Sequence, residues 1–316
     1  MIHPNLIQQI TLELNNVCNL SCPLCQRESA EMKPFLKQKN HLHFETLLNA
    51  LDKFKNLKEI SIVGNLSEPV LYYKFLNLIK ELKKRNLNLT IATNGNPYSE
   101  TFWKDFGESL DSNDKCIFAI DGSTQEKYQQ YRINGKLSKV IENYRVFARN
   151  TRAKKVVQTI KFPWLEEDLN KEFEEIQKLI NENQVNLSIY KFTKKPLKNH
   201  TTDNIQTEED KIINQFYEKI IKKNKDRKIE IDCFSSIDKH IYINYLGDII
   251  PCCFTHDELL LNRDNPNTLK IPNIYDASNI NFEHTFNIFF TDWYENKIYK
   301  NQICLETCSK KLKYFR

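Results

Sequence analysis

Apolar positions follow two alternating periods from residue 9 to about residue 195. Short runs rich in Ile, Val, Leu or Phe predict six strands: Gln9–Leu14, Glu59–Val63, Asn88–Ala92, Cys116–Ile120, Val156–Lys161 and Asn186–Phe192. Between these runs, apolar residues recur every three or four positions, which predicts amphipathic helices. The helical pattern is clear in residues 44–54, 72–82, 140–147 and 169–180. Regular alternation of strand and helix indicates an α/β fold with a parallel sheet covered by helices.

The pattern also predicts how the chain divides. Six strand–helix units are too few for a closed eight-unit barrel, so we expect a partial (β/α)6 TIM-like barrel over residues 1–195. A polar linker and one helix are expected over residues 196–227. Beyond them, apolar runs at Ile241–Tyr245 and Ile249–Ile250 flank Gly247 and predict a hairpin. We therefore expect a small C-terminal domain over residues 228–316.

Composition and charge narrow the class of protein. The chain has 316 residues and a net charge of +5, and it is long enough for about two domains. Lysine runs at Lys191–Lys198 and Lys219–Lys228 are more typical of a solvated face than of a nucleic-acid site. No segment approaches the ~18 apolar residues of a membrane span, and residues 1–10 do not resemble a signal peptide. We expect a cytoplasmic protein without a membrane or nucleic-acid partner.

The nine cysteines carry the chemistry of the chain. In a reducing compartment, such cysteines point to metal binding or catalysis rather than to disulfides. Cys18, Cys22 and Cys25 follow the first predicted strand with the spacing C-x3-C-x2-C. Three thiolates can hold three irons of a 4Fe–4S cluster and leave the fourth iron open to a small molecule. A zinc knuckle is the alternative, although zinc favours paired cysteines and four ligands.

This motif, C18-N-L-S-C22-P-L-C25, resembles the signature of the radical SAM superfamily. The resemblance implies that S-adenosylmethionine (SAM) binds the open iron. It also implies that an electron from the cluster cleaves SAM to a 5′-deoxyadenosyl radical, which abstracts a hydrogen atom from a substrate carbon. Such an enzyme needs a reducing electron donor such as flavodoxin or ferredoxin.

Four later segments also resemble the family, and all but one come directly after a predicted strand. They are Val63–Pro69, Thr93–Gly95, Ala119–Gly122 and Tyr131–Arg132. Polar residues at the ends of parallel strands meet at one edge of a sheet. By resemblance, we expect the following residues to bind SAM: Gly64, Asn65, Glu68, Thr93, Asn94, Asp121 and Arg132. Each segment alone would also suit an ordinary β–α turn.

Four of the remaining six cysteines form a second set in the C-terminal part of the chain. Cys233 and Cys252 flank Gly247 as C-x13-G-x4-C, and Cys304 and Cys308 follow as C-x3-C. This pattern resembles the SPASM/twitch-like auxiliary-cluster module of radical SAM enzymes. The resemblance implies a second 4Fe–4S cluster with all four irons bound by protein. A structural zinc site with four cysteine ligands is the alternative.

Two cysteines remain outside these sets. Cys253 directly follows a predicted ligand, and its weak S–H bond could donate a hydrogen atom to a carbon radical. A spare thiol near the cluster or an alternative ligand is the more ordinary interpretation of this residue. Cys116 starts a predicted strand and is expected to be a small buried hydrophobic residue.

The favoured function is thus a radical SAM enzyme of the oxidoreductase or epimerase type. The favoured reaction is dehydrogenation or epimerisation of a small molecule similar to a sugar or an aminocyclitol. Alternatives are a peptide-modifying maturase and an RNA- or nucleotide-modifying enzyme. A non-catalytic iron–sulfur or zinc scaffold is the alternative from another class.

Overall fold

The computed structural model describes residues 3–161, 169–180, 186–191, 233–261 and 270–291. The chain divides into two compact units. The sheet unit consists of Thr11–Glu45 and Lys58–Lys194, and the C-terminal unit consists of Met1–Ile10, Thr46–Leu57 and Lys195–Arg316. The domain limits at residues 195 and 227 stay predictions.

Six strands lie in the order β6-β5-β4-β3-β2-β1, and all of them belong to the sheet unit except for the first two residues of β1. Their bounds are β1 Gln9–Leu12, β2 Glu59–Ile62, β3 Asn88–Thr93, β4 Lys115–Ala119, β5 Lys154–Lys161 and β6 Asn186–Lys191. Strands β2 to β6 pair in parallel. Every predicted strand is present within two residues of its expected bounds. The prediction of an α/β partial barrel is confirmed.

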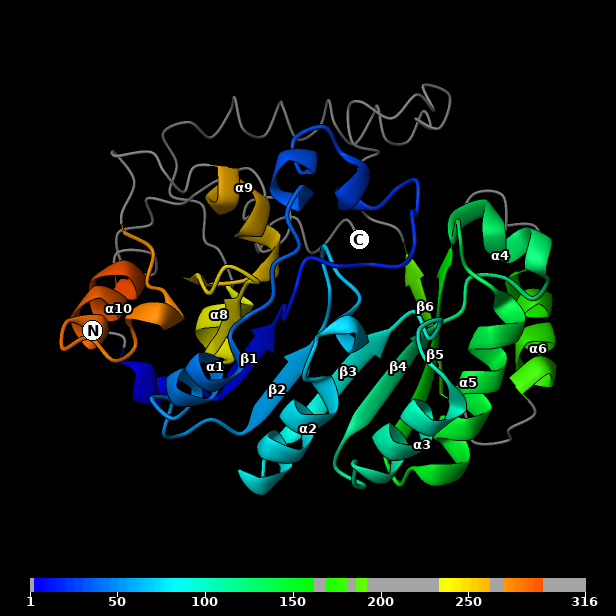
Figure 1. Ribbon diagram of the computed structural model, residues 1–316, viewed down its shortest axis with the longest axis horizontal. Helices are drawn as coiled ribbons and strands as arrows, with labels where there is room; N and C mark the ends of the chain where they lie inside the picture. The colour runs from blue at the N-terminus through cyan, green and yellow to red at the C-terminus, as the bar shows by residue number, and fades with distance from the viewer. Residues whose placement is uncertain (1–2, 162–168, 181–185, 192–232, 262–269, 292–316) are drawn as a thin grey trace. The chain divides into compact units, whose positions relative to one another are not determined.

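Helices connect these strands. Their bounds are α1 Phe44–Leu51, α2 Phe75–Lys84, α3 Glu100–Glu108, α4 Gln125–Tyr131, α5 Leu137–Asn150 and α6 Leu169–Ile180. In Figure 1, α2, α3, α5 and α6 lie along one side of strands β2–β6, and α4 lies near the ends to which the strand arrows point. The shorter 3-10 helices are η1 Pro4–Leu6, η2 Gln26–Glu28, η3 Lys33–Leu36 and η4 Pro69–Leu71.

Helix α3 was not predicted from the sequence, yet it carries part of the core. Trp103 and Phe106 are fully buried, with ring centroids 5.1 Å from Phe118 and 5.2 Å from Phe147, respectively. A Cβ atom on Gly107 would lie 3.0 Å from the carbonyl oxygen of Phe147. The glycine therefore allows α3 to pack closely against α5.

The parallel register brings the strand ends together. Ile62 pairs with Ile91, Thr93 with Phe118, and Ala119 with Gln158. The loops that follow β2, β3 and β4 therefore leave the sheet at the same edge, where ligands of parallel α/β proteins usually bind.

The C-terminal unit contains α8 (Phe234–Ile237), β7 (His240–Ile243), β8 (Ile249–Ile250), α9 (His256–Leu261) and α10 (Phe282–Thr291), with η6 (Cys253–Thr255) and η7 (Ile274–Asp276) between them. Strands β7 and β8 are antiparallel and form the predicted hairpin. Gly247 has a φ of +84°, which only glycine adopts easily. Asn244 Oδ1 accepts hydrogen bonds from Leu246 N (2.9 Å) and Asp248 N (3.0 Å), which fix the turn.

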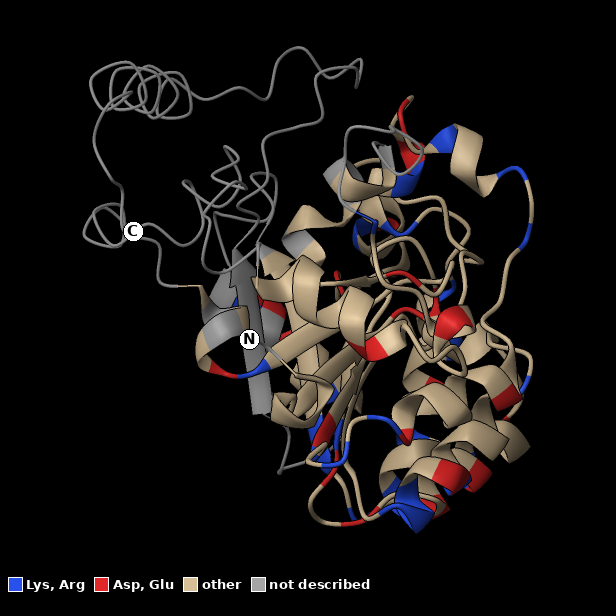
Figure 2. Ribbon diagram, turned by 90° about the vertical axis from the view of Figure 1, so that its left-hand side faces the viewer, with Lys and Arg blue, Asp and Glu red and all other residues tan. Residues whose placement is uncertain are grey.

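Charges of both signs are interspersed over the helices of the sheet unit (Figure 2). On α2, Glu81 pairs with Lys84 at 2.6 Å and with Arg85 at 3.3 Å. The predicted solvated lysine runs lie outside the residues whose side chains the structure describes. Among the described helices, none is both long and apolar enough to cross a bilayer.

Candidate functional site

The three N-terminal cysteines lie on the loop that follows β1. Cys22 is buried, and Cys18 and Cys25 are half-buried. The amide of Cys25 donates to the carbonyl oxygen of Cys22 (2.9 Å), and the amide of Leu20 donates to Cys18 Sγ (3.5 Å). All three cysteines pack in one apolar cluster with Leu20 and Tyr131. The loop therefore gathers three sulfur atoms in one partly buried place.

The chemistry of this donor set fits an iron–sulfur cluster. Burial raises the pKa of Cys18 to about 11 and that of Cys22 to about 12, so these thiols keep their protons until a metal displaces them. In the described ranges, no three Cys, His, Asp or Glu side chains converge as ligands of a single ion would. Thiolates that bind a cluster each contact a different iron and need no common point. Three soft sulfur donors on one loop could hold three irons of such a cluster, and the fourth iron would then have no protein ligand from this loop.

Asp121 and Arg132, both expected to bind SAM, form a buried ion pair. Arg132 Nε donates to Asp121 Oδ2 at 2.6 Å. Arg132 Nη1 also donates to Cys22 Sγ at 3.8 Å, and its guanidinium lies 5.1 Å from the centre of the Tyr131 ring. Asp121 is 1% exposed and accepts a second hydrogen bond from Ile160 N (2.7 Å). Arg132 thus connects the end of β4 to the cysteine loop.

Glu68 joins the ends of β2 and β3. It is 2% exposed, and its Oε1 accepts from Thr93 Oγ1 (2.6 Å) while its Oε2 accepts from Asn94 N (2.8 Å). Burial raises the pKa of Glu68 to about 7, against the lowering effect of these hydrogen bonds. Asn94 Nδ2 in turn donates to Asn19 Oδ1 on the cysteine loop (2.9 Å). The Glu68 carboxylate therefore links the loop after β2 to the end of β3, and Asn94 extends this link to the cysteine loop.

The turn after β2 is tight and firmly held. A Cβ atom on Gly64 would lie 1.9 Å from the carbonyl oxygen of Ser67, so this position requires glycine. Leu66 N donates to Glu13 Oε1 at 2.5 Å, and the carbonyl oxygen of Leu66 accepts a hydrogen bond from Arg27 Nη1. Both backbone polar atoms of one turn residue are thus held by charged side chains.

Glu13 and Arg27 were not predicted as site residues, although the sequence around each contains a feature that could have indicated a role. Glu13 is a charged residue within an apolar stretch and is fully buried. Arg27 comes two positions after the third cysteine. Asn15 was missed as well: its Oδ1 accepts from Val17 N at 2.7 Å, and its Nδ2 donates to the carbonyl oxygen of Glu68 at 3.4 Å.

The expected SAM-binding residues all lie in the sheet unit: Thr93 ends β3, Arg132 follows α4, and the others lie on the loops after β2, β3 and β4. Two hydrogen-bonded groups connect most of them: Glu68 with Thr93 and Asn94, and Asp121 with Arg132. Gly64 and the half-buried Asn65 lie on the turn after β2. Their roles toward SAM stay predictions.

In the C-terminal unit, Cys233 directly precedes α8, and Pro251 separates Cys252 from the end of β8. Ser235 Oγ of α8 donates to the carbonyl oxygen of His240 (2.6 Å), at the end of the hairpin where β8 finishes. Cys233 and Cys252 therefore lie toward the same end of the hairpin. Cys252 Sγ is 3.8 Å from Thr255 Oγ1, and Cys252 is buried.

Cys304 and Cys308 lie outside the described residues, so the four-cysteine site stays a prediction. Cys253 is half-buried at the start of η6, next to Cys252. Cys116 is fully buried in β4, as expected of a small hydrophobic residue.

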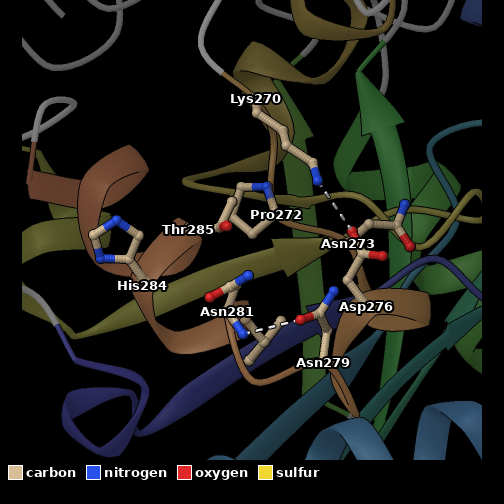
Figure 3. Close-up of a pocket in the computed structure, with 9 residues that line it drawn as sticks. Lys270, Pro272, Asn273, Asp276, Asn279, Asn281, His284 and Thr285 are labelled. Atoms are coloured by element: carbon tan, nitrogen blue, oxygen red, sulfur yellow. Dashed lines mark hydrogen bonds and ion pairs between the residues drawn. The ribbon is translucent and has the colours of Figure 1, made fainter.

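A separate pocket of about 330 Å³ is present in the C-terminal unit (Figure 3). Lys270 and Asp276, which both line it, form an ion pair with Nζ and Oδ2 3.8 Å apart. Asn273 Nδ2, also at the pocket, donates to Asp248 Oδ1 at 2.8 Å. Its polar lining thus bonds largely within the protein, and none of the sequence-predicted site residues lines this pocket.

No family model matches the chain. A curated relative, the tungsten-containing aldehyde ferredoxin oxidoreductase cofactor-modifying protein of Pyrococcus furiosus, is 26% identical over 104 residues. This match spans 32% of the chain and 28% of the length of that relative.

Solved structures give a broader match. SuiB of Streptococcus suis bound to SAM matches with a TM-score of 0.56 at 14% identity, over 98% of this chain and 72% of SuiB. The anSMEcpe structure with bound SAM matches with a TM-score of 0.54 at 15% identity, over 89% of this chain and 79% of that chain. Both belong to the radical SAM enzymes. The chain shares the fold of these structures, in agreement with the partial barrel that the sequence predicts.

Proposed function

We propose that the protein is a radical SAM enzyme. The observation that carries this proposal is the loop holding Cys18, Cys22 and Cys25, which packs at the edge of the sheet where the loops after β2, β3 and β4 emerge. The shared fold with SAM-bound SuiB and anSMEcpe supports it. Under this proposal the three thiolates hold a 4Fe–4S cluster whose fourth iron binds SAM.

Bound together, the cluster and SAM would supply a 5′-deoxyadenosyl radical, formed with one electron from the external donor, for abstraction of a hydrogen atom from substrate. The residues of the chain bind and orient these groups. Gly64, which is exposed and has no side chain, lets a ligand approach the backbone of its turn. Thr93 and Asn94, held by Glu68, and Asn65 supply polar groups at the same edge. Asp121 holds Arg132 against the cysteine loop.

The C-terminal unit would hold a second, auxiliary 4Fe–4S cluster through the following cysteines: Cys233, Cys252, Cys304 and Cys308. Four thiolates bind all four irons, so this cluster would accept an electron or stabilise the fold rather than bind SAM. The common end of the hairpin shared by Cys233 and Cys252 supports the pairing of these two ligands. Flavodoxin or ferredoxin is the proposed electron donor, in the cytoplasm.

The proposed reaction is dehydrogenation or epimerisation of a small molecule similar to a sugar or an aminocyclitol. Peptide modification is the second candidate. It is favoured by the structure of SuiB bound to its precursor peptide SuiA, which matches this chain with a TM-score of 0.51 at 13% identity over 89% of its length and 66% of SuiB. For epimerisation, the Cys253 thiol would transfer a hydrogen atom to the substrate radical, and the thiyl radical left behind would be reduced to the thiol by one electron from the electron donor and a proton.

Metal analysis tests the proposal. Full-length protein purified without oxygen and reconstituted with iron and sulfide should bind about eight irons per chain, which corresponds to two clusters. A chain that binds zinc and forms no iron–sulfur chromophore would instead be a zinc scaffold.

Two neighbouring cysteines provide a matched pair of variants for the auxiliary site. Cys252→Ala should lower the iron content by about half, because one of two clusters loses a ligand. Cys253→Ala should keep the full iron content and still cleave SAM, but it should lose the epimerised product. Unchanged product formation by the Cys253 variant would rule out its role as hydrogen donor.

A further inference from the structure

Arg132 lies between a buried carboxylate and one of the predicted cluster ligands. Its Nε faces Asp121 Oδ2 at 2.6 Å, and its Nη1 faces Cys22 Sγ at 3.8 Å. The side chain of Arg132 is 14% exposed, and that of Asp121 is fully buried. The ion pair therefore presents its positive end to the sulfur atom.

Several contacts fix this geometry. Asp121 Oδ1 accepts hydrogen bonds from Ile160 N (2.7 Å) and Thr159 Oγ1 (3.5 Å), so the carboxylate is held by β5 as well as by Arg132. The Tyr131 ring stacks 5.1 Å from the guanidinium. The amide of Arg132 donates to the carbonyl oxygen of Tyr128 at 2.9 Å, which ends α4 at this residue. A planar guanidinium so held has little freedom to leave the sulfur.

We propose that Arg132, oriented by Asp121, donates a hydrogen bond to the thiolate of Cys22 and thereby makes the SAM-binding cluster easier to reduce. This inference rests on the proposed function, and it gives Arg132 a role distinct from the expected contact with SAM. Arg132 acts through the sulfur ligand and is a positioning residue.

The physical reason is electrostatic. One-electron reduction adds negative charge to a cluster that is already anionic through its thiolate and sulfide ligands. A buried positive charge and a hydrogen bond to a ligand sulfur stabilise the reduced form more than the oxidised form. The Arg132 side chain is 14% exposed and Cys22 is 7% exposed, so solvent screens this charge-assisted interaction only weakly. The electron itself comes from the external reductant, dithionite in the experiment below.

The experiment is a redox titration of the reconstituted full-length protein without SAM, followed by electron paramagnetic resonance. SAM added at the end identifies the signal of the SAM-binding cluster, because only that signal changes. At a fixed potential, Arg132→Gln should lower the ratio of reduced to oxidised cluster about tenfold, which equals ~59 mV for one electron. Arg149→Gln, which removes one exposed charge from α5 of the same unit, should leave the ratio unchanged.

Arg132→Lys is the second variant. Lysine keeps the positive charge but lacks the planar guanidinium that Asp121 holds in place. The ratio of reduced to oxidised cluster in this variant should therefore fall about threefold, which is less than in the Gln variant. If Arg132→Gln does not bind a cluster, the threefold fall in the Lys variant must be present for the proposal to stand.

Each other outcome has a definite meaning. An unchanged ratio in both variants, together with weaker SAM binding, would overturn the proposal and assign Arg132 to SAM. Equal falls in the Lys and Gln variants would also overturn it, because the positive charge that lysine keeps near the sulfur would then have no effect on reduction of the cluster. A wild-type protein without any iron–sulfur signal would instead refute the proposed function itself.

Discussion

Replacing Glu68 tests quantitatively how its buried carboxyl group, which connects β2 and β3 through hydrogen bonds, affects stability. Its carboxylate is 2% exposed, and burial raises its pKa to about 7 from the ordinary 4.5. A carboxyl group with a higher pKa in the folded than in the unfolded chain stabilises the fold below pH 4.5, and this stabilisation is lost as the pH rises through 7. The shift corresponds to about 3 kcal/mol, because one pKa unit equals ~1.4 kcal/mol.

The perturbation is Glu68→Gln. The amide can accept a hydrogen bond from Asn94 N through its oxygen and donate to Thr93 Oγ1 through its nitrogen, so it keeps both contacts while staying neutral at every pH. In the wild type, ionisation of Glu68 makes the free energy of unfolding depend on pH; in the Glu68→Gln variant this contribution should be absent. At pH 8 the variant should be more stable than the wild type by up to about 3 kcal/mol, and at pH 4.5 the two should be nearly equal.

The assay is urea unfolding of the cluster-free chain from pH 4.5 to pH 8, followed by tryptophan fluorescence, with Trp103 buried in the same unit. With an m-value of about 1–3 kcal/mol per molar urea, the two midpoints should separate by about 1 M or more at pH 8. Glu126→Gln, which changes an exposed carboxylate on α4, should follow the wild type. Midpoints of the wild type and Glu68→Gln that run parallel across this pH range would refute the reasoning.

Other predictions follow from single contacts. Gly64→Ala should weaken SAM binding to the reconstituted protein at least about tenfold by calorimetry, because its Cβ would lie 1.9 Å from the Ser67 carbonyl oxygen; unchanged affinity would contradict the tight turn. Asp114→Ala should lower the free energy of unfolding by about 3–5 kcal/mol in urea, since the buried Asp114 pairs with Lys83 at 2.9 Å; a loss under 1 kcal/mol would contradict this. Cys116→Ala should cost about 1 kcal/mol of unfolding free energy and keep the iron content of the wild type; iron loss would make Cys116 a ligand.

The fold was largely predictable because each strand carries a local signal. Short apolar runs and their spacing located all six strands of the sheet unit. Helix α3 was missed because its nine residues include Gly107 and four charged residues, and only Trp103 and Phe106 mark its buried face. Its burial depends on the aromatic side chains of β4 and α5, which are distant in the sequence.

The candidate site was predictable only in part, because it too depends on contacts between residues that are distant in the sequence. The cysteines were found because their spacing is local. The carboxylate of Glu13 meets Leu66 across 53 positions, and Arg132 meets Cys22 across 110 positions. No local pattern encodes such contacts, since they form only when the parallel register brings loop ends together. A resemblance to known motifs identified Arg132, but the structure supplied its sulfur contact.

The most direct test of the central claim is reductive cleavage of SAM. Reconstituted wild-type protein with dithionite and SAM should release 5′-deoxyadenosine, measured by chromatography. The variant with Cys18, Cys22 and Cys25 all replaced by Ala should release none, while Cys116→Ala should match the wild type. Release of 5′-deoxyadenosine by the triple variant at the wild-type rate, or no release by a wild-type protein that holds its clusters, would contradict the account.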